Sequence, residues 1–140
     1  MDSIRIRSAA KVIEVNDAGE TITLNFGDQD FPNRFFAMLD RVQARATQAE
    51  QEEKAIRSSK DQDEAARALA AFSADLHRFI MAEVDGVFGA NTCRKVFGDI
   101  VPGVELFDEF FTALMPYFEQ YGKERAQRLQ KYSAQRSGDV

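Results

Sequence analysis

The sequence predicts a mainly α-helical protein with a small N-terminal β-hairpin, in which an antiparallel helical hairpin is followed by a C-terminal helical segment. Three observations lead to this α+β class. Apolar residues alternate with polar ones before residue 27, then recur at helical spacing in two stretches, and an aromatic stripe follows after residue 100. With 140 residues, the chain is long enough for a core of its own.

The N-terminal part carries the period-2 pattern typical of a half-buried sheet. Residues 16–20 have the sequence Asn-Asp-Ala-Gly-Glu, which contains residue types that tolerate a positive φ and predicts a turn. We expect a β-hairpin within residues 4–26, including a third short strand at residues 4–7. The alternating apolar residues are Ile4, Ile6, Ile13, Val15, Ile22, Leu24 and Phe26.

Two apolar seams with alternating spacings of four and three residues predict a pair of antiparallel helices. Asp28 or Asp30 can cap the first helix, whose first turn contains Pro32. A polar break at residues 57–61 separates the helices, and the tip at residues 50–64 should be solvated. The seams consist of Phe35, Leu39, Val42, Ala46 and Ala49, and of Ala65, Leu69, Phe72, Leu76 and Phe79. We expect Leu39, Val42, Phe72 and Leu76 to make contacts between the helices.

A short helix framed by two Phe-Gly pairs is predicted within residues 87–99. Asn91 or Thr92 can cap its first turn, and Gly98 can supply the left-handed residue that ends it. This pattern indicates a built element and not a featureless loop.

The C-terminal segment is predicted to be helical from about Pro102. Pro116 should kink or split this helix near Met115, and Gly122 should break it again. Residues 1–122 would then form one α-rich domain, and residues 123–140 a polar, basic terminal helix and tail. The apolar stripe consists of Val104, Phe107, Phe110, Phe111, Leu114 and Phe118.

Composition excludes several classes of function. A formal net charge of −5 argues against general nucleic-acid binding, which needs a basic face. A single cysteine cannot form an internal disulfide, which favours a reducing compartment. No stretch approaches the ~18 apolar residues of a membrane helix, and no signal peptide is apparent. We therefore expect a cytoplasmic protein without membrane or nucleic-acid partners.

The sequence gives little indication of catalysis. His77 and Cys93 are each unique, and a Cys–His pair would require them to meet in space beside a third, orienting group. The alternative is a half-buried cysteine and a histidine on a helix face. One His and one Cys cannot complete a zinc shell, and no calcium loop or phosphate-binding loop is present. We expect no enzyme, no cofactor and no metal site.

Charge and aromatic content favour interaction with other proteins. Acids predominate in residues 83–119 and bases in residues 123–136, so the basic arm could meet an acidic face of another copy or of a partner. The alternative is a solvated helix of mixed charge. The chain has 12 Phe and no Trp, and such rings build a core or an adhesive surface. The candidate partner-binding residues are Phe88, Phe97, Phe107, Phe111, Lys123, Arg125 and Arg128.

Three blocks of the sequence together resemble the tail assembly chaperones of long-tailed bacteriophages and prophages. The blocks are residues 14–24, the Phe-Gly-framed residues 88–99, and residues 114–118 followed by residues 121–125. The central block, Phe-Gly through Cys-Arg-Lys-Val-Phe-Gly-Asp, is the most specific. The helical hairpin matches only in character. No catalytic or binding position can be carried over from this family.

The resemblance implies a function in the host-cell cytoplasm. Such a protein binds the tape-measure protein and keeps it soluble until tail tube subunits polymerise around it. The other partners that it implies are the tail tube subunits, a form of the same chain extended by ribosomal frameshifting, and further copies of the chain. The alternative hypothesis is a structural tail or connector component that stays in the phage particle.

Overall fold

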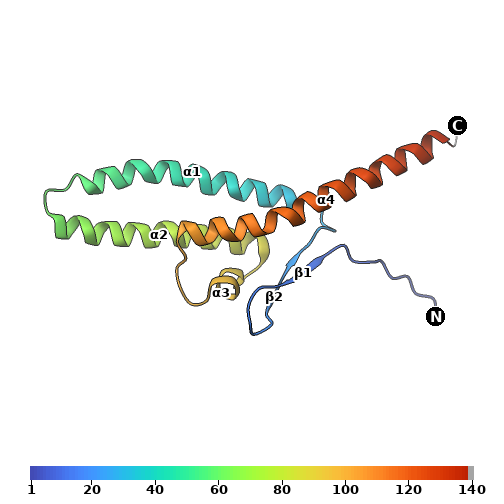
Figure 1. Cartoon of the computed structure of the whole chain (residues 1–140), viewed down its shortest axis with the longest axis horizontal. Helices are drawn as coiled ribbons and strands as arrows, with labels where there is room; N and C mark the ends of the chain where they lie inside the picture. The colour runs from blue at the N-terminus through green and yellow to red at the C-terminus, as the bar shows by residue number, and fades with distance from the viewer. Residues whose placement is uncertain (139–140) are drawn as a thin grey trace. The chain divides into compact units, whose positions relative to one another are not determined.

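The computed structural model describes the backbone of residues 1–138 and the side chains of residues 1–134. In this part of the chain, a two-stranded antiparallel hairpin is followed by four helices, which confirms the predicted, mainly α-helical class (Figure 1). The chain divides into two compact units, Met1–Val104 and Glu105–Val140. The first unit holds the sheet and three helices, and the second consists of one long helix.

The β-hairpin joins β1 (Lys11–Glu14) to β2 (Thr21–Leu24), with Ile13 opposite Ile22. Gly19 adopts a φ of +81° in the connecting turn, as its residue type predicts. The side-chain oxygen of Asn16 accepts hydrogen bonds from the backbone N–H groups of Ala18 and Glu20, at 3.0 and 3.1 Å. These bonds close the turn that the sequence predicts.

The predicted hairpin extends too far toward the N-terminus. Residues 1–10 form no strand, and Ile4 and Ile6 are 89% and 86% exposed. A segment with an alternating pattern becomes a strand only when its backbone hydrogen-bonds to the edge of a sheet. No segment of residues 1–138 pairs with the outer edge of β1. The expected strand at residues 4–7 is therefore wrong, and the hairpin covers residues 11–24 instead of 4–26.

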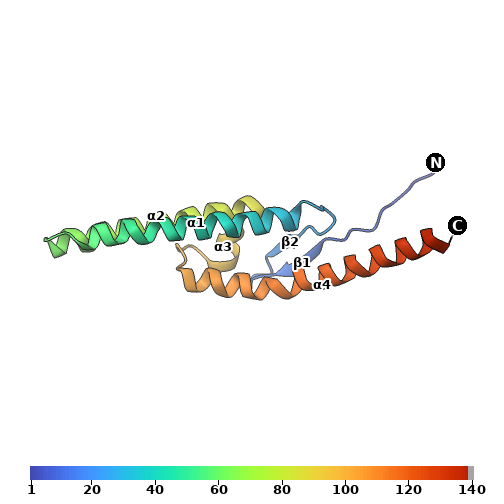
Figure 2. The same cartoon turned by 90° about the horizontal axis from the view of Figure 1, so that it is seen from above.

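The long helices α1 (Phe31–Arg57) and α2 (Gln62–Phe88) lie side by side in both views (Figures 1 and 2). Arg41 Nε on α1 donates to Glu83 Oε2 on α2 at 2.8 Å. Nearer the tip, the Arg45 guanidinium lies 5.8 Å from the centre of the Phe72 ring. These pairs run in opposite directions along the two helices, which confirms the antiparallel arrangement.

The buried core of the helical hairpin lies at its open end, and the middle of the two seams is less buried. Phe31, Phe35 and Met38 of α1 and Ile80 and Val84 of α2 are buried. In contrast, Leu39, Val42, Phe72 and Leu76 are only half-buried, and Ala46 is exposed. Two helices alone can bury only a narrow stripe, whereas β2 and α3 pack on α2 near the open end. Periodicity along α1 and α2 carries no information about those added layers.

The short helix α3 (Thr92–Phe97) is held by other elements. Asn91 has a φ of 69° and makes no side-chain cap, and Thr92 Oγ1 donates to the Gly89 carbonyl at 2.7 Å. Neither residue caps the helix as predicted. Instead, Asp85 Oδ1 of α2 accepts from the N–H of Cys93 at 2.9 Å. Gly98 ends the helix with a φ of +84°, as expected.

The second unit contains α4 (Val104–Gly138), which continues through Pro116 and Gly122. A split near Met115 and a break at Gly122 are therefore wrong, whereas the alternative of a kink at Pro116 stays a prediction. Proline removes one helical N–H donor, and glycine costs about 1 kcal/mol relative to alanine. A helix of 35 residues keeps its other backbone hydrogen bonds and can carry these local costs. The stripe residues with buried side chains are Phe107, Phe110, Leu114 and Phe118.

Candidate partner-binding groove

A groove crosses α1 and α2 near the open end of the helical hairpin and has a volume of about 400 Å³. Half of its lining is small or apolar, and half is polar or charged. The first group consists of Ala37, Ala82, Gly86 and Val87, and the second of Asn33, Arg34, Arg41 and Glu83.

Gly86 faces open space. A Cβ atom added at this position would meet no other atom within 4 Å, and the residue lies inside α2 without a positive φ. Neither the backbone conformation nor a contact within residues 1–134 therefore requires glycine here. Glycine has no side chain and so leaves space at this position. It also weakens the helix by about 1 kcal/mol relative to alanine, so this space has a cost in stability. That space is available to a side chain from another molecule.

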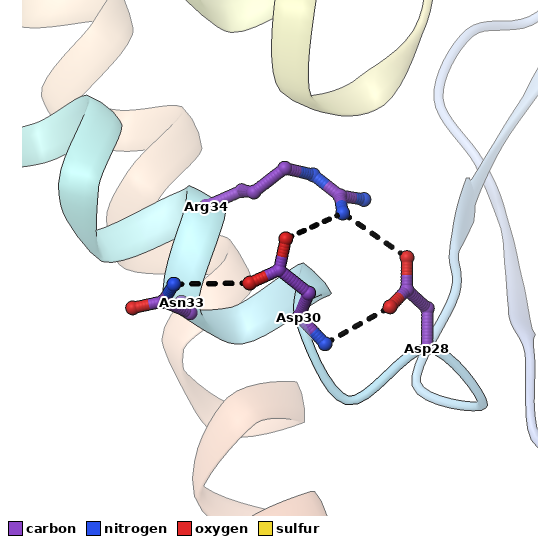
Figure 3. A network of polar contacts seen from close by, with 4 residues as sticks. All are labelled: Asp28, Asp30, Asn33 and Arg34. Carbon is purple, nitrogen blue, oxygen red and sulfur yellow. Dashed lines mark hydrogen bonds and ion pairs between the residues drawn. The ribbon is translucent and has the colours of Figure 1, made fainter.

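A polar network organises one end of the groove (Figure 3). Arg34 Nη1 lies 3.1 Å from Asp28 Oδ2 and 3.2 Å from Asp30 Oδ2. Asn33 donates its amide N–H to Asp30 Oδ1 at 3.0 Å, and the backbone N–H of Asp30 donates to Asp28 Oδ1 at 2.9 Å. Asp30 stands at the N-cap position of α1, but its carboxylate makes no cap bond because it binds these side chains instead. Asp28 and Asp30 thus orient Arg34.

The network favours the charged forms of Asp30 and Arg34. Hydrogen bonds from Asn33 and then Arg34 lower the pKa of Asp30 below its ordinary value of 3.8. The hydrogen bond to Asp28 is the main cause that raises the pKa of Arg34. Both side chains are substantially exposed, so the ion pairs orient Arg34 more than they stabilise the fold.

Arg41 and Glu83 form a second charged pair in the lining, and this pair links the two helices. The Glu83 side chain is 20% exposed and that of Arg41 is 55% exposed, so the pair is accessible from solvent. Both arginines of the groove are thus matched by carboxylates. A partner would meet small side chains and oriented polar groups here, with little net charge.

The aromatic candidate residues do not form this groove. Phe88 is half-buried and packs edge-on against Phe31 and Phe35, with ring centres 5.8 and 5.9 Å apart. Phe97 is half-buried at the end of α3. Phe107 is 2% exposed and stacks with the half-buried Phe111 at 6.3 Å. Phe107 is therefore an interior residue and offers no exposed ring to a partner.

The basic candidate residues lie together on α4. Lys123, Arg125 and Arg128 are exposed, and Arg128 pairs with Glu124 one helical turn earlier at 3.7 Å. A shallow depression runs along the same helix and is lined by Glu124, Gln127, Arg128, Gln130, Lys131 and Ala134. The side chain of Arg136 and residues 139–140 of the predicted tail lie outside the described part.

The groove has a signal in the sequence, but apolar periodicity does not register it. Ala82 and Gly86 are four residues apart, so they share one face of α2. Small residues at this spacing allow a neighbouring backbone to approach a helix closely. Apolar seams are defined by large side chains, so Ala82 and Gly86 do not contribute to them.

Cys93 and His77 have separate partners. Burial, together with the Asp85 carboxylate, raises the pKa of the Cys93 thiol to about 12, so the nucleophilic thiolate is not populated at neutral pH. The thiol lies 3.7 Å from the Met81 carbonyl, and His77 Nδ1 lies 2.6 Å from the Ser73 carbonyl. The hypothesis of a Cys–His nucleophile receives no support from these contacts.

Two further searches gave negative results within the described residues. No group of three or more His, Cys, Asp and Glu side chains there could hold a metal ion. None of the helices in that part is long and apolar enough to span a membrane.

Comparison with protein families gives a match over residues 18–139, a range that contains β2 and all four helices. The chain belongs to the DUF6673 family. DUF6673 is described as a family of unknown function, so membership defines the extent of the shared region and assigns no activity. Searches of curated proteins and of solved structures gave no match.

Proposed function

We propose that this DUF6673 protein is a bacteriophage tail assembly chaperone. It binds the tape-measure protein in the host cytoplasm and keeps it soluble while tail tube subunits polymerise around it. The proposal starts from the resemblance of the three sequence blocks. The structural observation that carries it is the open groove across α1 and α2, with unoccupied space beside Gly86.

The groove suits a helical client. A long helix with an apolar stripe exposes side chains at spacings of three and four residues, and it aggregates unless that stripe is covered. Ala37, Ala82 and Gly86 let such a helix approach closely, so that its apolar side chains enter the groove. Arg34 and Arg41 can then hydrogen-bond polar groups that flank the stripe of the client.

The same features favour release. A volume of about 400 Å³ is near the lower end of the range for ligand sites, so it accepts only a few client side chains. Charges in the lining are already paired, so they add little attraction. A chaperone must yield its client to the tube subunits, and weak contacts repeated along a client meet that need. The net charge of −5 helps to keep a loaded complex in solution.

Co-expression with the tape-measure protein of the same phage or prophage tests the proposal. We expect a larger soluble fraction of that protein than in cells that express it alone, and we expect the two to co-purify. An unrelated helical protein of similar size and charge is the control. Equal insolubility of the tape-measure protein with and without this chain would contradict the proposal.

The rival hypothesis, a structural component retained in the particle, predicts a different distribution. A chaperone leaves before the tail is complete, so purified particles should lack this chain, whereas lysates of infected cells should contain it. Quantitative mass spectrometry of both fractions separates the two. Stoichiometric amounts in mature tails would favour the structural component.

A further inference from the structure

The outer edge of β1 is open. Val15 N–H donates to the Glu20 carbonyl at 2.9 Å, just beyond the pair of Glu14 with Thr21. Hydrogen-bonded and non-hydrogen-bonded pairs alternate along antiparallel strands. The backbone groups of Ile13 therefore point toward β2, and those of Val12 and Glu14 point away from it.

The opposite edge of the sheet is already engaged. Lys95 Nζ of α3 donates to the outward carbonyl of Thr21 on β2 at 3.2 Å, and Asn16 Nδ2 donates to the Lys95 carbonyl at 3.0 Å. Within residues 1–138, no hydrogen bond to the outward backbone groups of Val12 and Glu14 is present. The Val12 side chain is 63% exposed. A two-stranded sheet with such an edge can accept a third strand.

Residues 3–7 have the pattern of that missing strand. Ile4 and Ile6 alternate with Arg5 and Arg7, and the two isoleucines are almost fully exposed. The segment runs away from the hairpin as an extended chain (Figure 1). Two exposed β-branched side chains in an extended segment would gain apolar burial by joining a sheet.

The chain is poorly built to add this strand to its own β1. Residues paired across antiparallel strands lie on the same face. Ile4 and Ile6 can therefore share the face of Ile13 only if an even number of residues connects the two strands. The two-residue connection is Ser8-Ala9, which lacks the residue types that adopt the positive φ of tight hairpin turns. A four-residue connection formed by residues 7–10, Arg-Ser-Ala-Ala, keeps Lys11 in β1 but likewise lacks Gly, Asn and Asp, and the segment runs away from the hairpin instead of folding back on it. The strand is therefore better supplied by another molecule.

We propose that residues 3–7 of one copy pair with the outer edge of β1 in a second copy, and that the exchange is reciprocal, forming a two-fold dimer. Ile4 and Ile6 then lie on the face of Ile13, which also carries the buried Ile22 and Leu24. Arg5 and Arg7 lie on the opposite face, beside the exposed carboxylate of Glu14. The match of both faces, together with the course of residues 3–7 away from their own hairpin, identifies a second copy as the occupant.

Sedimentation of the full chain tests the proposal, which does not depend on the chaperone function. The wild-type chain should be a dimer, and a variant lacking residues 1–7 should be a monomer with unchanged helical circular dichroism. Val12→Pro removes the outward N–H and should also give a monomer. Val12→Thr keeps the N–H and the β-branched shape and should remain a dimer.

Mixing tests the exchange itself. The truncated variant keeps the open edge, and Val12→Pro keeps the donated strand, so each should be monomeric alone and the mixture should contain a heterodimer. A monomeric wild-type chain would overturn the proposal. It would do so even if the Val12 and Glu14 amides were protected from hydrogen exchange, because residues 3–7 would then pair with β1 of the same chain. A truncated variant that stays dimeric would overturn it as well.

Discussion

Asp85 of α2 caps the start of α3 through Cys93: its Oδ1 atom accepts a 2.9 Å hydrogen bond from the Cys93 backbone N–H. The helix α3 has only six residues and no side-chain cap from its own N-cap residue, Asn91. A helix this short is not stable without support from the rest of the fold. Burial raises the pKa of the Cys93 thiol, and the same carboxylate adds to this rise. One side chain thus attaches α3 to α2 and contributes to keeping the single cysteine protonated.

Replacing Asp85 tests this cap. Asp85→Ala should lower the free energy of unfolding by about 0.5–2 kcal/mol, the usual cost of losing a helix cap. Asp85→Asn keeps an acceptor oxygen and should lose less. Urea denaturation followed by circular dichroism measures both. If the two variants are equally stable, the hydrogen bond to the Cys93 N–H does not hold α3.

The stability of the fold should depend on Cys93 at alkaline pH. Below pH 9.0, the ordinary pKa of the thiol, both folded and unfolded chains keep the proton. As the pH rises from 9.0 toward about 12, the unfolded chain loses this proton and the folded chain retains it, so stability falls. The slope for one proton is at most about 1.4 kcal/mol per pH unit. The difference between wild type and Cys93→Ala isolates this contribution; identical pH profiles would contradict it.

Truncation of the core should be most costly at the open end of the helical hairpin. Phe35 is fully buried and contacts Phe36 and Phe88, so Phe35→Ala should cost about 3–5 kcal/mol. Leu76 is only half-buried, so Leu76→Ala should cost less. Chemical denaturation of both variants gives the comparison. A larger loss for Leu76→Ala would place the core back in the middle of the seams.

The parts of the fold that follow from local rules could be predicted from the sequence. Alternation around Ile13 and Ile22 predicts the hairpin, Gly19 predicts its turn, and the polar break before Asp61 predicts the turn between α1 and α2. The split at Pro116 and the break at Gly122 did not occur, because each residue imposes only a local cost that a helix of 35 residues can carry.

Features that depend on distant residues could not be predicted. The cap from Asp85 to Cys93 and the bond from Lys95 to Thr21 join separate elements, and no spacing rule connects them. The groove depends on the absence of a side chain at Gly86, which a search for apolar periodicity does not register. The number of phenylalanines predicts a core or an adhesive surface without deciding which ring serves which, and the structure places the candidate Phe107 among the buried side chains.

The basic end of α4 should be dispensable for folding. Side chains from residue 123 to residue 134 are exposed except for the half-buried Glu124, so a chain that ends at Gly122 should unfold at nearly the wild-type urea concentration. If this arm meets an acidic surface of a partner, the truncation should weaken that association and added salt should mimic it. Sedimentation at low and high salt tests both points. Unfolding of the truncated chain would instead assign the arm to the core.

Binding of the tape-measure protein by variants at Gly86 tests the central claim most directly. Gly86→Ala meets no other atom and should strengthen the helix by up to about 1 kcal/mol, with binding retained. Gly86→Leu also points into open space, but its side chain occupies the groove. Calorimetric titration of the two variants, with their unfolding measured alongside, should show a folded Gly86→Leu chain that has lost most of its affinity. Wild-type affinity in Gly86→Leu would contradict the assignment of this groove as the binding site for the client.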